Sequence, residues 1–165
     1  MPAFTLVHVV LSLVGIGSGL IVMYGMLRGK RMDSGTALFL ATTALTSVTG
    51  FFFPFHKVTP GIVVGIISLV VLAVAIVARY AKHLQGGWRS TYVITAAVAL
   101  YLNVFVLVVQ LFAKVPDLKA LAPTQSEAPF VISQVVVMAI FVVWTIFAVK
   151  KFHGPDGLRG LASSR

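Results

Sequence analysis

Residues 91–113 read TYVITAAVALYLNVFVLVVQLFA, and this stretch contains no Asp, Glu, Lys or Arg. An α-helix needs about 20 predominantly apolar residues to cross the hydrocarbon core of a bilayer. The stretch exceeds that length, and Asn103 and Gln110 are its only amide side chains. It therefore predicts a membrane-spanning helix.

Four more apolar runs of similar length lie on either side of this one, at residues 4–27, 35–55, 61–81 and 130–149. Short alternating segments, which are typical of membrane β-barrels, are absent from the sequence. All seven prolines fall near the ends of runs or between them, so no run is interrupted in its middle. We predict an all-α bundle of five transmembrane helices within one domain, residues 1–149. A basic tail, residues 150–165, should follow it and be mobile.

Composition excludes a water-soluble domain of this size. The chain has 165 residues, of which 59% are hydrophobic and 10% are charged, and its mean hydropathy is +1.02. Soluble domains carry roughly 25% charged residues. Because a small domain leaves much of its surface exposed, it has no room to bury so many apolar side chains. The absence of Cys excludes disulfides, thiolate catalysis, iron–sulfur clusters and thiolate zinc sites.

Positive charge is divided unevenly between the segments that connect the runs. If the N-terminus is outside, the outer segments hold three basic residues, Lys57, Lys114 and Lys119. The inner segments then hold ten: Arg28, Lys30, Arg31, Arg79, Lys82, Arg89, Lys150, Lys151, Arg159 and Arg165. Because Lys and Arg accumulate in cytoplasmic loops, we predict an N-out, C-in protein of the bacterial inner membrane. The same rule explains the net charge of +9 without a nucleic-acid partner. Aromatic anchors are expected at the inner interface, at Tyr24, Tyr80, Trp88 and Tyr92.

Small residues predict where the helices pack. His8, Ser12, Gly15 and Gly19 are spaced to lie on one helix face, and Gly61 and Gly65 form a GxxxG pair. Lipid is as apolar as Leu, so membrane helices associate through small and polar side chains. We expect helix contacts at Ser12, Gly15, Gly19, Gly61 and Gly65.

The candidate site consists of histidines and amides expected in the outer half of the bundle: His8, His56, Asn103, Gln110 and Gln134. One hypothesis gathers them in an outer polar pocket, where Gln110 or Gln134 is the partner of His8. Alternatively, each contributes to an ordinary contact between helices, at about 0.6 kcal/mol. No cofactor is predicted from the residues. The alternative is a b-type haem held by His8 and His56, with His83 and His153 as a second pair, because neutral imidazoles bind haem iron axially.

No charged side chain is expected deep in any run, which argues against transport coupled to membrane carboxylates. Before the last run, Ser126 and Glu127 suit the start of a helix and are expected to cap it. A lid or a docking role for this outer loop is the alternative.

Three stretches resemble small multi-helix inner-membrane proteins of proteobacterial genomes whose function is uncharacterised: LTSVTGFFFPF at 45–55, LNVF at 102–105 and PTQSE at 123–127. The likeness extends over nearly the whole chain. It implies a membrane bundle and supplies no activity. A weaker likeness to haem-binding four-helix cytochromes rests on the histidine positions.

Function therefore has to be inferred from the residues. We expect a non-enzymatic accessory or assembly component, or a binder of a lipid-like ligand, whose partners are the bilayer and either other membrane proteins or itself. The alternative is a redox component that binds b-type haem or quinone. A small permease or channel is disfavoured, because the predicted spans are uncharged and uninterrupted.

Overall fold

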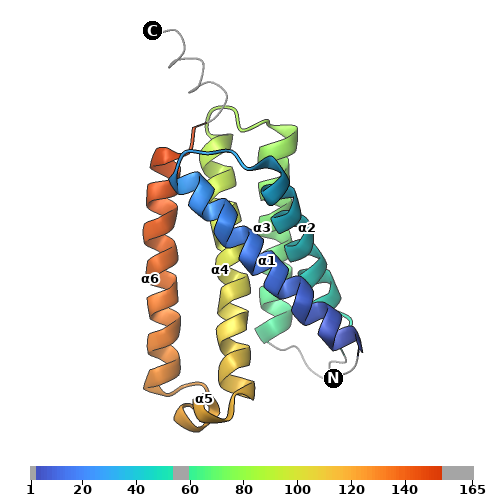
Figure 1. Ribbon diagram of the computed structural model, residues 1–165, viewed down its shortest axis with the longest axis vertical. Coiled ribbons are helices and arrows are strands. Elements are labelled where there is room, and N and C mark those ends of the chain that lie inside the picture. The colour runs from blue at the N-terminus through green and yellow to red at the C-terminus, as the bar shows by residue number, and fades with distance from the viewer. Residues whose placement is uncertain (1–2, 54–59, 154–165) are drawn as a thin grey trace.

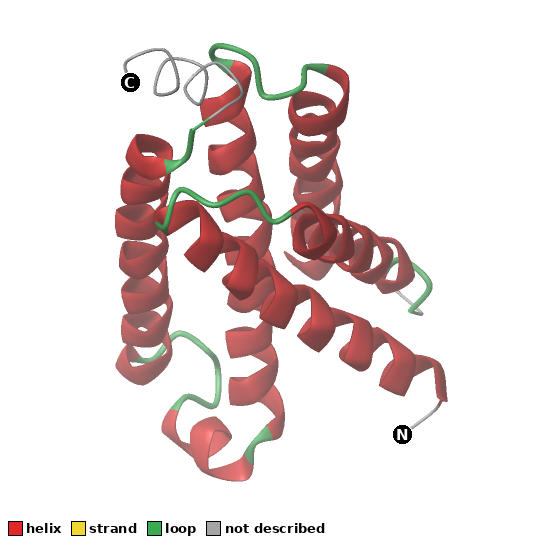
Figure 2. Cartoon of the chain, turned by 45° about the horizontal axis from the view of Figure 1, so that its top comes forward, coloured by secondary structure: helices red, strands yellow, loops and turns green. Residues whose placement is uncertain are grey.

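The computed structural model describes residues 3–53 and 60–153, which form helices joined by short loops and include no β-strand (Figure 2). The helices are α1 (Ala3–Leu27), α2 (Asp33–Gly50), α3 (Pro60–Ile76), α4 (Trp88–Lys114), α5 (Pro116–Leu121) and α6 (Ala128–Lys151). A single π-helical turn, η1 (Val77–Ala81), continues α3. The predicted all-α class is confirmed.

Four helical segments are long and apolar enough to cross a membrane, namely α1, α3 together with η1, α4 and α6. The helix α2 differs, because its 18 residues begin at Asp33 and include many Ser and Thr. At 1.5 Å per residue it is about 27 Å long, close to the ~30 Å hydrocarbon core. It ends at Gly50, and a turn follows where the sequence predicted more helix. A fifth crossing by α2 stays a prediction.

The centre of the bundle is α4, which packs against α1, α2, α3 and α6 (Figure 1). The helix α1 runs diagonally across the front of the bundle and packs along α2, while α6 lies beside α4. Ala96, Ala97 and Ala99 on α4 are almost completely buried. Small side chains at these positions let neighbouring helices approach the backbone of α4 closely.

Gly19 marks the tightest helix crossing. A Cβ atom added there would lie 2.6 Å from Leu100 Cδ1 on α4 and 2.8 Å from Phe39 Cδ2 on α2. Gly17, two residues away, faces open space. Gly15 and Gly65 also lie at contacts, whereas Gly61 is exposed and Ser12 is half-buried with its hydroxyl bonded to its own helix.

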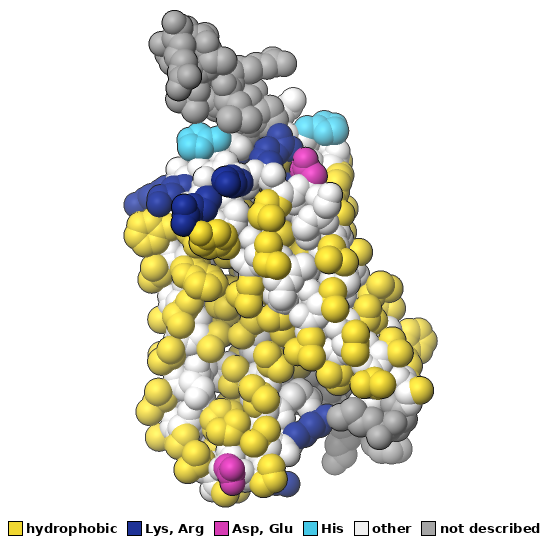
Figure 3. Space-filling model, in the orientation of Figure 1, with side chains coloured by type: hydrophobic (Ala, Val, Ile, Leu, Met, Phe, Trp, Pro, Cys, Tyr) yellow, Lys and Arg dark blue, Asp and Glu magenta, His cyan; other side chains and the backbone are white. Residues whose placement is uncertain are grey.

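The two ends of the bundle differ in charge. Lys and Arg gather at the end where α1 and α6 finish (Figure 3), which we call the basic end. It comprises the described basic residues Arg28, Lys30, Arg31, Arg79, Lys82, Arg89, Lys150 and Lys151. The chain starts at the opposite end. The predicted mobile tail lies outside the described residues, apart from its first few.

Candidate functional site

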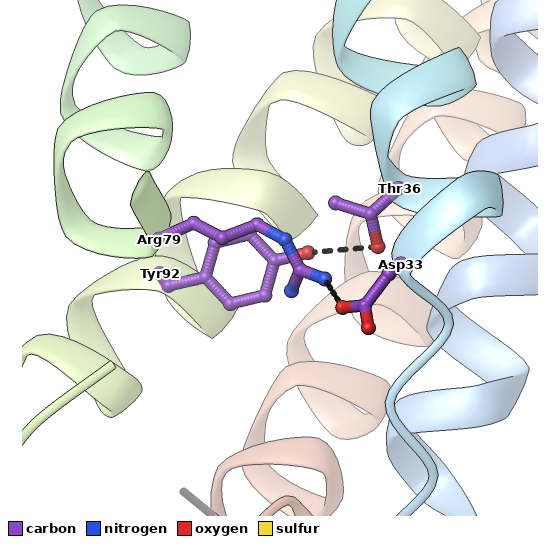
Figure 4. A network of polar contacts seen from close by, with 4 residues as sticks. All are labelled: Asp33, Thr36, Arg79 and Tyr92. Atoms are coloured by element: carbon purple, nitrogen blue, oxygen red, sulfur yellow. Dashed lines mark hydrogen bonds and ion pairs between the residues drawn. The ribbon is translucent and has the colours of Figure 1, made fainter. Parts of the chain in front are cut away.

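A buried cation links three helices at the basic end (Figure 4). Arg79 on η1 is 5% exposed and donates a hydrogen bond to Asp33 at the start of α2. Its guanidinium lies over the ring of Tyr92 on α4, 5.2 Å from the ring centroid. The Tyr92 hydroxyl in turn donates to the Thr36 hydroxyl at 3.4 Å. We call these four residues the Arg79 network.

Arg79 faces inward because it continues the buried face of α3, where Leu72 and Ala75 precede it at helical spacing and are also buried. Arg79 itself lies in the π-helical turn, in which Lys82 donates its backbone N–H to the carbonyl of Val77, five residues earlier, at 2.9 Å. A cation in such a place needs a partner, because a buried unpaired charge is strongly destabilising.

The sequence indicated Arg79 only as an inner basic residue and Tyr92 only as an interface anchor. In the structure the two side chains are buried against each other. Tyr24, Tyr80 and Trp88 are exposed. A signal for the pairing was present in the sequence, because Asp33 is the only acid before residue 117 and is surrounded by basic segments.

Arg89 also has a structural role. Its Nη1 donates to the carbonyl of Val149 at 2.7 Å and to the carbonyl of Phe152. The side chain therefore ties the start of α4 to the end of α6, where helix carbonyls lack partners within the helix. Lys82 lies over the ring of Trp88, 5.5 Å from its centroid.

A second polar group lies where α1, α2 and α4 meet, and we call it the polar junction: Gly15, Thr42, Thr43, Thr46 and Asn103. A Cβ atom on Gly15 would lie 3.1 Å from Thr43 Oγ1 and 3.3 Å from Asn103 Nδ2. Among the described residues, no partner is recorded for the buried Thr43 Oγ1, Thr46 Oγ1 and Asn103 Nδ2 atoms. The junction brings polar atoms of α2 and α4 together at the glycine of α1.

His8 pairs with α2 rather than with an amide. Its Nδ1 lies 2.9 Å from Thr49 Oγ1, and its ring packs edge-on against Phe53, with centroids 5.1 Å apart. The Thr49 hydroxyl donates to the carbonyl of Leu45 at 2.7 Å. With its hydrogen directed to Leu45, the Thr49 hydroxyl is left to accept a hydrogen bond from His8 in the tautomer protonated at Nδ1.

The four described residues of the candidate outer pocket, His8, Asn103, Gln110 and Gln134, have different surroundings. Gln134 Nε2 donates to the Phe105 carbonyl at 3.2 Å and joins α6 to α4. Gln110 is exposed on α4, and Asn103 belongs to the polar junction. His56 lies outside the described residues. Within the described ranges, no group of three or more His, Asp or Glu is placed to hold a metal ion.

Glu127 stabilises the loop before α6 rather than the first turn of that helix. Its carboxylate accepts hydrogen bonds from the Thr124 hydroxyl at 2.7 Å, the Thr124 N–H at 3.2 Å and the Ser126 N–H at 3.1 Å. These bonds, the Thr124 hydroxyl foremost, hold the pKa of Glu127 below its usual value. The expected side-chain cap on α6 is not formed, because the carboxylate is turned back into the loop.

The end of α1 shapes a pocket at the basic end. Gly29 has φ of +68°, and its N–H bonds to the Met26 carbonyl while the Lys30 N–H bonds to the Gly25 carbonyl. This pair of bonds is the Schellman motif that ends many helices at a glycine. It turns the chain back over the last turn of α1, so that Lys30 and Met32 lie beside Gly25.

The resulting cavity, which we call the basic pocket, has a volume of about 200 Å³. Its lining consists of Ile21, Tyr24, Gly25, Arg28, Lys30 and Met32. Along α1 the lining changes from the apolar Ile21 through Tyr24 to the cationic Arg28. Polarity in the pocket therefore rises toward the end of the bundle.

The cations of the basic pocket have no acidic partner in the described part of the chain, where Arg79 and Asp33 form the only salt bridge. Arg28 instead lies over the Tyr24 ring at 5.1 Å. The signal for this turn in the sequence was Gly29 itself, because Gly is favoured just after a helix end, where the backbone is left-handed.

Comparison with known protein families, with curated proteins and with solved structures gave no match.

Proposed function

We propose that this chain is a non-enzymatic protein of the bacterial inner membrane, an accessory or assembly component that binds a lipid-like ligand. In this proposal all five long helices cross the bilayer, and the basic end faces the cytoplasm. The excess of Lys and Arg at that end supports the orientation. The polar contacts that attach α2 to α1 and α4 support a crossing by α2 as well.

The basic pocket is the observation that carries the proposal. The polar side chains of Arg79, Arg89 and His8 are engaged by other parts of the chain. The pocket, in contrast, combines a cavity, an apolar wall and cations without acidic partners. An amphipathic molecule at a membrane surface has the complementary distribution of polarity.

Lipid retention tests this function. The protein, purified in a mild detergent, is analysed by native mass spectrometry after delipidation and after addition of a defined bacterial lipid mixture. We expect a one-to-one lipid adduct that survives at activation energies that remove bulk detergent. Protein that appears without any lipid adduct at all lipid concentrations would contradict the proposal.

A redox component is the second candidate, with b-type haem or quinone at His8 and His56. The observation that favours it is the hydrogen bond between His8 Nδ1 and Thr49 Oγ1, because metal-binding histidines use a hydrogen bond at one ring nitrogen to orient the other. An absorption spectrum of the purified protein tests this candidate. A Soret band that disappears in both His8→Gln and His8→Leu would move it to first place.

A further inference from the structure

We propose that the basic pocket binds the phosphodiester headgroup of an anionic phospholipid through Arg28 and Lys30, with an acyl chain along Ile21 and Tyr24. This inference rests on the proposed lipid-binding function and specifies the class of ligand. Three of the lining residues, Ile21, Tyr24 and Gly25, lie on one face near the end of α1, and Arg28 directly follows the helix.

The order of these residues matches the order of groups in a phospholipid. Ile21 and Tyr24 are 56% and 57% exposed, so both offer apolar or aromatic surface to an acyl chain and its ester. Arg28 follows one turn later, just past the end of α1. A water-soluble phosphate ester has no acyl chain that would contact the apolar part of this surface.

Neither cation has an acidic partner among the described residues. The Schellman motif fixes the backbone of Lys30 through its N–H, and the Tyr24 ring supports the Arg28 guanidinium. The motif also supplies backbone partners for the Gly25 and Met26 carbonyls, so these carbonyls do not need the side chains of Arg28 and Lys30 as donors. The side-chain N–H groups of Arg28 and Lys30 are therefore available to phosphate oxygens, which Arg binds through paired donors.

Zwitterionic and anionic lipids carry the same phosphodiester, but the former bring their own ammonium group. With no acid in the lining, the pocket has nothing to pair with that ammonium. Basic pockets beside transmembrane helices on the cytoplasmic side favour anionic headgroups for this reason. Selectivity for net negative charge is thus the property that separates this inference from general lipid binding.

The test compares phosphatidylglycerol and phosphatidylethanolamine, added in equal amounts to the full-length protein in detergent, by native mass spectrometry. We expect phosphatidylglycerol to be preferred, and expect each of Arg28→Gln and Lys30→Gln to lower its occupancy about fivefold. Arg31→Gln is the matched control, since it removes the same charge from the same loop outside the pocket lining. It should change the occupancy less than twofold.

The outcomes separate the two proposals. Equal retention of both lipids, or equal loss in Arg28→Gln and Arg31→Gln, overturns the headgroup assignment and leaves lipid binding intact. Absence of any adduct overturns the proposed function itself. Displacement of phosphatidylglycerol by millimolar inorganic phosphate would show that the site holds free phosphate rather than a lipid. A melting temperature close to that of the wild type confirms that each variant is folded.

Discussion

Arg79 and Asp33 are 46 residues apart in the sequence, and their ion pair joins the π-helical turn after α3 to the first turn of α2. The pair is asymmetric, because the Arg79 side chain is 4% exposed and the Asp33 side chain is 76% exposed. The exposed carboxylate of Asp33 thus pairs with a guanidinium that is buried inside the bundle. The contact therefore fixes where the least apolar of the long helices begins.

The first prediction concerns this pair. Asp33→Asn should lower the free energy of unfolding by about 1–3 kcal/mol, because it leaves the buried guanidinium without its anionic partner. Thermal unfolding in detergent measures the effect. Asp117→Asn is the control, since Asp117 is exposed on α5 and forms no salt bridge with any described residue. If both variants melt at the same temperature, the ion pair does not stabilise the fold.

Substitution by Ala should change the stability of the bundle in opposite directions at two glycines of α1. Gly19→Ala should destabilise the bundle by about 1–3 kcal/mol, because the new Cβ would overlap Leu100 and Phe39. Gly17→Ala should instead stabilise it by up to about 1 kcal/mol, since it adds helix propensity where nothing is near. A shared sign for the two melting-temperature shifts would be incompatible with the crossing described here.

The bond between His8 and Thr49 gives a third prediction. His8→Leu should cost about 1 kcal/mol, the net value of one hydrogen bond, whereas His8→Gln should cost less because an amide N–H can still donate. A double-mutant cycle with Thr49→Val isolates the pair. A coupling energy of zero would mean that His8 is held by its packing on Phe53 alone.

Glu127 gives a pH prediction for the loop before α6. Its pKa is lowered in the folded protein, so the bonds to Thr124 and Ser126 are fully present above the ordinary pKa and are lost as the pH falls through the lowered one. Thr124→Val should therefore raise the pKa of Glu127 toward the ordinary value of 4.5. Carboxyl chemical shifts followed by NMR over pH 2–6 report the titration directly, and an unchanged midpoint would contradict this assignment.

Hydrophobic run length predicted the positions of the helices well, because a bilayer allows few alternatives to a helix of about 20 residues. Small residues also predicted the crossing at Gly19, since close approach of helices needs a missing side chain. The expected depth of a residue in the membrane is a poorer guide to which residue it contacts. His8 and Gln110 were expected at one level, but His8 lies against α2 while Gln110 points away from the bundle.

The Arg79 network was missed because Arg79 was counted only as a topology charge near the end of the run at residues 61–81. Its spacing from the buried Leu72 and Ala75 places it on the same helix face, toward Tyr92. The basic pocket was missed for the same reason, because the charge count used Arg28 and Lys30 only as topology signals.

The central claim is that five helices cross the membrane with the basic end in the cytoplasm. Since the chain has no Cys, single cysteines can be labelled in intact cells with a membrane-impermeant maleimide without background. Phe52→Cys and Lys119→Cys should be labelled, and Gln85→Cys should be labelled only after the cells are permeabilised. All three positions are exposed in the structure. Labelling of Gln85→Cys in intact cells would contradict the orientation, and an Arg31→Cys variant found on the same side as Phe52→Cys would show that α2 does not cross.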